Sequence, residues 1–280
     1  MSKEQEQCFL EARAFIAKNN LDPVRKLDDY DVLRFCRARK FDLPFVQVML
    51  ENYAKWRVDF KVENIERTME FPELPEVLKC FNFAYHGVDK EGCPIHIECS
   101  GMITQALWRV TTVERMHRFM VVHHENQMNF RFPAACEAAG KRVETQIIIN
   151  DLAGITMSTA DRNVYSLLKM TAQTGADYYP DILGTYFIIN CPSFFTFIWA
   201  ILKGWVDEKT RAKFKLIGAN YKEELLQKID ADQLPTFYGG TCACPGGCMN
   251  SDKGPWQDYL PVYPVGCVSK ALLMKAMFNN

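Results

Sequence analysis

The stretch IIINDLAGITMSTADRNVYSLLKMTAQTGADYYPDILGTYFII, residues 147–189, decides the fold class. Its two ends, Ile147-Ile148-Ile149 and Tyr186-Phe187-Ile188-Ile189, are short continuous apolar runs of the kind found in central strands covered on both faces. Between them a helical pattern follows Ser158-x-x-Asp161, which predicts a capping box at the start of a helix. Strand, helix and strand in this order predict a βαβ unit, and hence an α/β domain with a mainly parallel sheet.

The segments around this unit extend the pattern. Before it, the turn Gly92-Cys93-Pro94 leads into the alternating run 95–98, which predicts a strand, and residues 114–129 predict a long helix. After it, residues 214–217 predict one further strand. The region that follows Gly239-Gly240 is rich in Gly, Pro and Cys, which is typical of a meander on the surface.

The first third of the chain has a helical character instead. Apolar residues recur at helical spacing in 9–16 and in 45–56, and Asp28 or Asp29 is expected to cap a helix between them. We therefore expect an all-helical N-terminal region (1–75), an α/β domain (76–245) and a C-terminal surface tail (246–280). Within the tail, residues 258–280 suggest a short amphipathic helix that could cover the core or touch a membrane.

Composition limits the partners and the compartment. The chain has 280 residues, 48% of them hydrophobic, with a formal net charge of −1 and a pI near 6.5, so nucleic acid is not expected as its main partner. Residues 1–7 contain no apolar signal-peptide core, and the longest strongly apolar stretch, 194–206, is shorter than the roughly 20 residues of a membrane span. We expect a cytoplasmic protein whose 11 cysteines are reduced thiols.

One group of cysteines is spaced closely enough to suggest a metal site. Cys242, Cys244 and Cys248 lie close together, but the sequence offers neither a second CxxC pair nor a histidine near them. We therefore favour a loop of free thiols and predict no bound metal and no cofactor.

No constellation of residues points to catalysis. The sequence contains none of the GxGxxG, P-loop, GxSxG or HExxH motifs. His123 and His124 are adjacent on a predicted helix, so their side chains diverge by about 100° and do not easily chelate one ion together. Asp151 follows an expected strand, where it could serve a site but is better explained as the cap of a turn. We predict a protein that is not an enzyme.

One apolar segment does point to function. Residues 194–202 would form a helix that is apolar almost all round, as are helices buried in a core or in contact with lipid. The helix runs into Gly204 and then into the charged run 207–213. This arrangement favours a lid that enters a membrane interface over an ordinary core helix. The apolar residues of this segment are Phe194, Phe195, Phe197, Ile198, Trp199, Ile201 and Leu202.

The order and spacing of several motifs link the chain to a known family. They are LRFCRARKFD at 33–42, DKEGCP at 89–94, RFPA at 131–134, DLAG at 151–154, YYP at 178–180, LP at 234–235 and YGG at 238–240. Each motif alone is weak. Together, over residues 28–256, they resemble the CRAL-TRIO lipid-binding family and, within it, phosphatidylinositol/phosphatidylcholine transfer proteins.

The resemblance implies both a fold and an activity. It implies a helical N-terminal region packed against an α/β domain whose sheet floors a hydrophobic cavity, with residues 194–202 as the gate helix. It also implies a carrier that encloses one phosphatidylinositol and exchanges it during transient contact with Golgi, endosomal or other internal membranes. Such a carrier is expected to be a monomer and could stimulate inositol-lipid kinases by exposing the headgroup to them.

The resemblance also assigns a headgroup site. The family positions that bind the inositol phosphate fall on Arg39, Lys40, Asp89, Asp181, Thr210 and Lys213. Basic side chains neutralise a phosphate, while carboxylates and a hydroxyl bond to inositol hydroxyls. Asp181 stands where the family usually has glutamate, so its shorter side chain is expected to need a bridging water. Without the family, Arg39 and Lys40 would be interpreted as a solvated helix end and Asp89 as a turn residue.

The phosphatidylcholine positions of the family are altered here. In that family two tyrosines hold choline by cation–π attraction, and two small hydroxyls on a strand bind the phosphate. The corresponding residues are Tyr85 and His96 for the tyrosines and Gln146 and Ile148 for the hydroxyls. We therefore expect weak or lost phosphatidylcholine binding, and a second-ligand pocket of different shape around these four residues.

Two alternatives stay open. The protein could carry another hydrophobic ligand, such as a sterol, tocopherol or retinoid, although a tocopherol offers no phosphate to the basic residues. It could also be a non-carrying interaction module in which the cavity has collapsed. Hinge roles for gate motion are predicted for Gly204, Gly239 and Gly240, and a turn explains the last two equally well.

Overall fold

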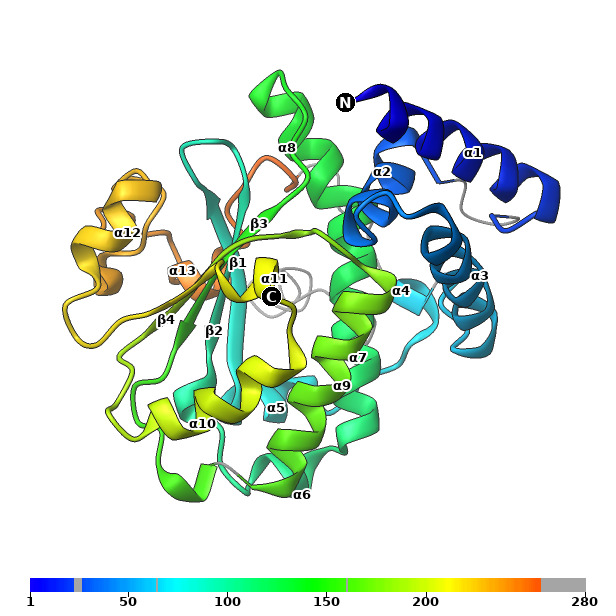
Figure 1. The fold of residues 1–280 in the computed structure, drawn as a ribbon. Helices are drawn as coiled ribbons and strands as arrows, with labels where there is room; N and C mark the ends of the chain where they lie inside the picture. The colour runs from blue at the N-terminus through cyan, green and yellow to red at the C-terminus, as the bar shows by residue number, and fades with distance from the viewer. Residues whose placement is uncertain (23–26, 64, 160, 258–280) are drawn as a thin grey trace. The chain divides into compact units, whose positions relative to one another are not determined.

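The computed structural model describes residues 1–22, 27–63, 65–159 and 161–257 (Figure 1). The amphipathic segment expected at 258–280 lies outside these residues. The chain forms two compact units, of which the first comprises residues 1–65 together with 173–181 and the second comprises the remainder. The break near residue 65 comes before the boundary expected at residue 75, and the second unit is interrupted by the short insertion 173–181.

The elements occur in the following order. They are α1 (Lys3–Asn19), α2 (Asp29–Ala38), α3 (Leu43–Asp59), α4 (Ile65–Thr68), α5 (Leu74–Cys80), β1 (Asn82–Val88), β2 (Pro94–Cys99), η1 (Ser100–Met102), α6 (Leu107–Val110), α7 (Val113–Asn126), η2 (Gln127–Arg131), α8 (Phe132–Ala139), β3 (Gln146–Asp151), η3 (Met157–Thr159), α9 (Arg162–Tyr178), β4 (Leu183–Ile189), α10 (Phe195–Leu202), η4 (Lys203–Trp205), α11 (Glu208–Arg211), β5 (Phe214–Leu216), α12 (Lys222–Lys228), η5 (Thr236–Tyr238) and α13 (Cys248–Ser251).

The first unit is built on helices α1, α2 and α3, of which α1 and α2 begin with capping boxes. At α2, Asp28 is the cap, because its Oδ1 accepts a 2.7 Å hydrogen bond from the Asp31 amide while the Asp31 carboxylate accepts one from the Asp28 amide. This settles the choice between Asp28 and Asp29. The three helices bury one shared core, which includes Ile16, Phe35 and Leu50.

The second unit contains one five-stranded sheet in the order β1-β2-β3-β4-β5. The hairpin pair β1 and β2 is antiparallel, whereas β2, β3, β4 and β5 are parallel. The predicted βαβ unit is therefore confirmed as β3, α9 and β4. Its helix begins at Arg162, where the Asp161 carboxylate accepts a 2.9 Å bond from the Val164 amide. Asp161 is thus a helix cap and not the fourth residue of a capping box.

The two faces of the sheet differ in character. One face carries isoleucines and a phenylalanine from the three central strands, and it is covered by Leu225 and Ile229, at and just after α12, and by Leu234 and Tyr238. The residues of this apolar face are Ile95, Ile97, Ile147, Ile149, Phe187 and Ile189. Because side chains alternate along a strand, the residues between them point to the opposite face.

A single row of register partners crosses that opposite face. Tyr85 pairs with His96, His96 with Ile148, Ile148 with Tyr186, and Tyr186 with Phe214. We call these five residues the cross-sheet row. Helix α10 covers its β5 end, where the Trp199 and Phe214 ring centroids lie 4.8 Å apart. The apolar helix expected at 194–202 therefore lies on the same sheet face as the predicted second-ligand residues.

Helix α10 has only 8 residues. Within the described part of the chain, no helix combines the length and the apolar character needed to cross a membrane.

Two phenylalanines of the second unit allow a matched test of the fold. Phe187 in β4 is fully buried, whereas Phe197 in α10 is 77% exposed. We expect Phe187→Ala to lower the free energy of unfolding by about 3–5 kcal/mol, because it leaves a cavity in the sheet core. The control Phe197→Ala should change it by less than about 0.5 kcal/mol. Urea denaturation followed by circular dichroism measures both, and equal losses would contradict the burial described here.

Candidate functional site

The six predicted headgroup residues are shared between the two units. The first unit holds Arg39, Lys40 and Asp181, and the second holds Asp89, Thr210 and Lys213.

In the first unit, the end of α2 faces the segment 173–181. The Arg37 Nε donates to Asp181 Oδ2 at 2.7 Å, and Arg39 Nη2 lies 3.9 Å from Asp177 Oδ1. Asp181 has a φ of +60°, so the chain turns sharply where it carries this carboxylate. Lys40, with a φ of +52°, is exposed just beyond the helix. The structure thus supplies two partners, Arg37 and Asp177, that were not assigned a role from the sequence.

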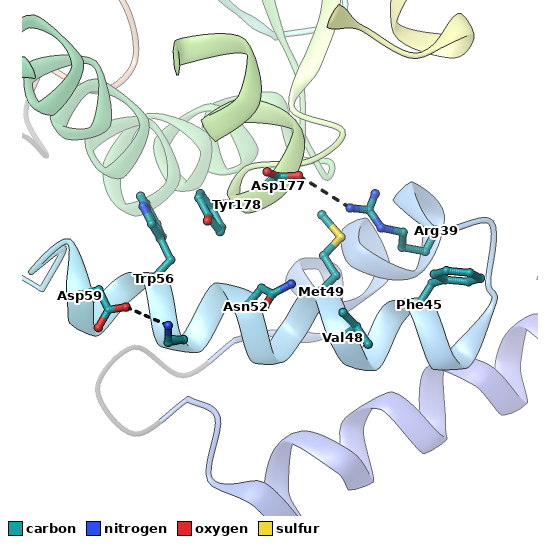
Figure 2. A pocket seen from close by; sticks show the side chains of 10 residues that line it. Arg39, Phe45, Val48, Met49, Asn52, Trp56, Asp59, Asp177 and Tyr178 are labelled. Carbon is teal, nitrogen blue, oxygen red and sulfur yellow. Dashed lines mark ion pairs between the residues drawn. The ribbon is translucent and has the colours of Figure 1, made fainter. Parts of the chain in front are cut away.

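An open groove of about 450 Å³ lies beside this set (Figure 2). Arg39 and Asp177 line part of it, and the stacked rings of Trp56 and Tyr178, 4.1 Å apart and 6° from parallel, line another part. Phe45, which is 63% exposed, adds an apolar side chain to the lining. The groove therefore combines a guanidinium with apolar and aromatic surface.

In the second unit, two of the predicted residues lie at one edge of the sheet, where the parallel strands begin. Lys213, just before β5, donates from its Nζ to the Leu183 carbonyl at 2.5 Å, and Leu183 opens β4. Asp89 closes the hairpin that enters β2 at the same edge. Thr210, in the short helix before Lys213, donates from its hydroxyl to Asp207 Oδ2 at 2.5 Å.

Asp89 also has a structural role. Its Oδ1 accepts hydrogen bonds from the Glu91 amide at 2.9 Å and the Cys93 amide at 2.8 Å. Burial raises the pKa of this carboxyl, and the two amides act against that rise. The interpretation of Asp89 as a turn residue is therefore correct, whether or not it also binds a ligand.

The four predicted second-ligand residues are brought together by the sheet. Tyr85, His96 and Ile148 belong to the cross-sheet row, and Gln146 Oε1 accepts from the Tyr85 hydroxyl at 3.3 Å. Two neighbours already pack against the Tyr85 ring: the His96 ring stacks at 4.6 Å, and the Arg131 guanidinium lies 3.9 Å from the ring centroid. Arg131 was not identified from the sequence, although it lies in the RFPA motif.

Polar atoms on this face are buried without a hydrogen-bond partner among the described residues. They are His96 Nε2, Gln127 Nε2 and Asn150 Oδ1. The other ring nitrogen of His96 lies 3.3 Å from Glu98 Oε1. Buried polar atoms nearly always have partners, so a water or another polar group is expected to bond to these three atoms.

The predicted gate residues divide between two faces of α10. Phe195 and Ile198 are buried against the sheet with Leu152 and Ile188, and Phe194, Trp199 and Leu202 are partly buried beside them. Phe197 and Ile201 are 77% and 53% exposed. The helix is therefore apolar toward the sheet and also toward solvent.

The predicted hinge glycines have different local requirements. At Gly204 a Cβ would meet no atom, so packing does not demand glycine there. At Gly239, with a φ of +89°, a Cβ would lie 2.6 Å from the Lys222 side chain, and at Gly240 it would lie 1.9 Å from the Leu234 carbonyl oxygen. A close-packed turn accounts for the glycine pair.

Two further candidates from the sequence have structural roles. Asp151 accepts from the Ala153 amide and from Asn190 Nδ2, both at 2.8 Å, and from the Tyr238 hydroxyl at 3.0 Å, so it caps a turn as expected. The His123 ring packs edge-on against Phe119. Burial, assisted by nearby His96, lowers the pKa of His124 to about 4, so this imidazole is neutral at physiological pH.

Comparison with known proteins links this geometry to one family. The CRAL/TRIO domain model matches residues 78–240. The Sec14 cytosolic factor of Schizosaccharomyces pombe is 39% identical over 236 residues, which cover 84% of this chain and 82% of that protein. The SEC14 cytosolic factor of Kluyveromyces lactis is 36% identical over 275 residues, which cover 97% and 90% of the two chains.

Plant relatives are longer. The phosphatidylinositol/phosphatidylcholine transfer protein SFH4 of Arabidopsis thaliana is 42% identical over 252 residues, which cover 89% of this chain. The match spans 41% of SFH4 and less than half of SFH7 and SFH12. The crystal structure of Sfh5 matches with a TM-score of 0.68 at 17% identity, covering 100% of this chain and 99% of the other, and shows likeness of fold alone.

The ion pair behind Tyr85 gives a testable consequence. Arg131 and Asp252 are both buried, with Arg131 Nη2 3.3 Å from Asp252 Oδ1, and the Trp256 indole donates to the same carboxylate oxygen at 3.2 Å. We expect Arg131→Met to lower the free energy of unfolding by about 3–5 kcal/mol, because it leaves a buried carboxylate without its counter-charge.

Adding Asp252→Asn should recover more than half of that loss, because the amide oxygen can still accept from Trp256. Chemical denaturation of both variants measures the difference. A double variant no more stable than Arg131→Met alone would contradict the charge argument.

Proposed function

Because the chain belongs to the CRAL/TRIO family, we propose that it is a lipid-transfer protein that encloses one phosphatidylinositol and exchanges it at membrane surfaces. The observation that carries this proposal is helix α10, which is apolar on both its buried and its exposed face and covers one end of the cross-sheet row. The plant relatives are named phosphatidylinositol/phosphatidylcholine transfer proteins, which supports the same activity.

The energetics of transfer require an enclosing site. A diacyl lipid has roughly 30 methylene groups, and at ~0.8 kcal/mol each it would cost on the order of 20 kcal/mol to expose them to water. A carrier must replace the membrane contact almost completely and then release the lipid. In our proposal α10 is the gate, and Phe197 and Ile201 enter the membrane interface when the helix moves away from the sheet.

The headgroup preference is inferred from the basic and acidic side chains. Arg39 and Lys40 in the first unit and Lys213 in the second supply charge for a phosphate, while Asp89, Asp181 and Thr210 supply groups that bond to hydroxyls. Arg37 holds the Asp181 carboxylate, and Asp207 holds the Thr210 hydroxyl. These two contacts orient the side chains, so in this proposal the ligand adds to them or displaces them.

The environment of Tyr85 supports weak phosphatidylcholine binding. A choline would need an aromatic face, but the His96 ring and the Arg131 guanidinium already pack against this ring. Ile148 cannot donate to a phosphate. A second ligand on this face would instead satisfy His96 Nε2 and Asn150 Oδ1, as a lipid with hydroxyl or amide groups could.

The wider role follows from the same proposal. A monomeric carrier that exposes an inositol headgroup at a cytoplasmic, Golgi or endosomal membrane would present substrate to inositol-lipid kinases. A carrier role requires no cofactor and no catalytic residue from the chain.

The bound lipid is the first quantity to measure. We expect purified protein extracted with organic solvent to yield phosphatidylinositol with little phosphatidylcholine, identified by mass spectrometry. Lys213→Ala should lower phosphatidylinositol loading by about 10-fold or more, because a charged hydrogen bond contributes about 1.5–3 kcal/mol.

Lys209→Ala, on the short helix that precedes Lys213 and outside the predicted site, is the control and should load normally. A circular dichroism melt of each variant separates a lost site from a lost fold. A sterol or another non-phosphorylated lipid in the wild type would favour the alternative carrier, and an empty, well-folded protein would favour an interaction module.

The gate is tested separately by transfer kinetics. We expect Phe197→Ser with Ile201→Ser to slow phosphatidylinositol transfer between vesicles at least 10-fold, since each apolar side chain buried at the interface contributes about 1.5–3 kcal/mol. The bound lipid should stay unchanged. Val58→Ser in α3, a residue that is 72% exposed, is the matched control. Equal transfer rates for the double variant and the wild type would rule out α10 as the membrane-contacting element.

A further inference from the structure

The fold places His86 beside Cys242, Cys244 and Cys248, although no histidine lies near these cysteines in the sequence. His86 comes from β1, Cys242 and Cys244 come from the loop after η5, and Cys248 begins α13. The four ligating atoms all lie within 4.8 Å of one another. We propose that these four residues bind one Zn²⁺ ion in a structural site, which does not depend on the lipid bound.

The separations fit a tetrahedral ion. Zn–S bonds of about 2.3 Å and Zn–N bonds of about 2.0 Å place tetrahedral ligand atoms about 3.5–3.8 Å apart. Cys242 Sγ and Cys244 Sγ are 3.6 Å apart, and Cys244 Sγ and His86 Nε2 are 3.5 Å apart. These two distances are those of atoms that share one small cation, and the remaining pairs, which all lie within 4.8 Å, would draw closer when the ion binds.

The surroundings match what zinc ligands need. The His86 Nδ1 lies 3.1 Å from the Gln233 carbonyl oxygen, so Nδ1 carries the proton and Nε2 presents its lone pair to the cysteines. The Cys244 amide points to Cys248 Sγ at 3.5 Å, an N–H···S contact that stabilises a thiolate. Lys253 Nζ lies 3.3 Å from Cys242 Sγ. Three thiolates and Zn²⁺ carry a net charge of −1, which this ammonium balances.

A tight loop between Cys244 and Cys248 brings these two cysteines close together. Gly246 and Gly247 have φ values of +74° and +92°, and the Gly247 amide donates to the Cys244 carbonyl at 2.9 Å. Residues other than glycine rarely adopt this conformation, so the pair fixes a tight loop that places Cys248 beside Cys244. The spacing is thus CxCxxxC, and the fourth ligand lies 158 residues from Cys244, which is why motif spacing did not identify the site.

The ligand set identifies the ion and its role. Three thiolates and one imidazole around a single position favour Zn²⁺ over the oxygen-preferring Mg²⁺ and Ca²⁺. Four protein ligands leave no position for a substrate or an activated water, so the ion is structural. It joins the loop that follows η5 to strand β1, where the Gly87 amide also donates to the Lys253 carbonyl at 2.7 Å.

Metal content of the full chain tests the proposal directly. Protein purified under reducing conditions without chelator should contain about one zinc per chain by plasma mass spectrometry. After zinc is removed, added Co²⁺ should give the thiolate-to-metal charge-transfer band and the strong d–d bands of a tetrahedral sulfur site. Cys244→Ser should lose both signals. Cys80→Ser, at the end of α5 and outside the cluster, should keep them.

A measurement on the wild type guards against misfolding of the variant. A zinc-selective chelator should lower the melting temperature, and one equivalent of Zn²⁺ should restore it. Absence of zinc and of the cobalt bands in folded, reduced protein would overturn the proposal. A disulfide among Cys242, Cys244 and Cys248 in protein isolated without oxidant would overturn it equally.

Discussion

The alternation of side chains along β1 to β5 is the constraint on which the rest of the second unit depends. In β2, β3 and β4 one set of alternate residues joins the apolar face under α12, and the set between them forms the opposite face with the cross-sheet row. A shift of one residue in the pairing register of any one strand would move all of its side chains to the opposite face of the sheet. Helix α10, the stacked rings of Tyr85 and His96 and the unpartnered atoms of His96 and Asn150 lie on one face because of this register.

The same alternation explains which parts of the fold could be predicted. Strands β3 and β4 were predicted from continuous apolar runs bounded by polar residues, and the helix expected between them predicted that they are parallel. The distinction between their faces was not visible, because Ile147, Ile148 and Ile149 are chemically identical although only Ile148 lies in the cross-sheet row. Strand β1 was not anticipated, since Asn82–Val88 mixes polar and apolar residues yet is buried over its middle five positions.

Contacts between residues far apart in the chain could not be predicted from sequence patterns. The resemblance to a family supplied Arg39, Lys40 and Asp181, but no spacing rule connects Arg37 to Asp181, which lies 144 residues away. The same holds for Arg131 on the Tyr85 ring and for His86 beside Cys244. In each case the contact forms only in the folded chain, so the type of either residue does not predict it. Of these contacts, that of Arg131 bears on the proposed headgroup preference, because it places a guanidinium 3.9 Å from the centroid of the Tyr85 ring.

The segments that cover the two faces of the sheet are attached by different interactions: the segment after α12 by a hydrogen bond, and α10 by apolar contacts. Asp151 accepts hydrogen bonds from Asn190 and from Tyr238, which lies in the segment after α12, so moving that segment would leave a partly buried carboxylate with one partner fewer. Helix α10 carries no charged residue, and its one hydroxyl, on Thr196, donates to the nearby Ser193 carbonyl at 2.9 Å. Its contacts with Leu152, Ile188 and Phe214 are apolar and without direction. In the proposed carrier, acyl chains could replace those contacts and leave the Thr196 hydroxyl bond intact, so displacing α10 would cost less than displacing the segment that holds Tyr238.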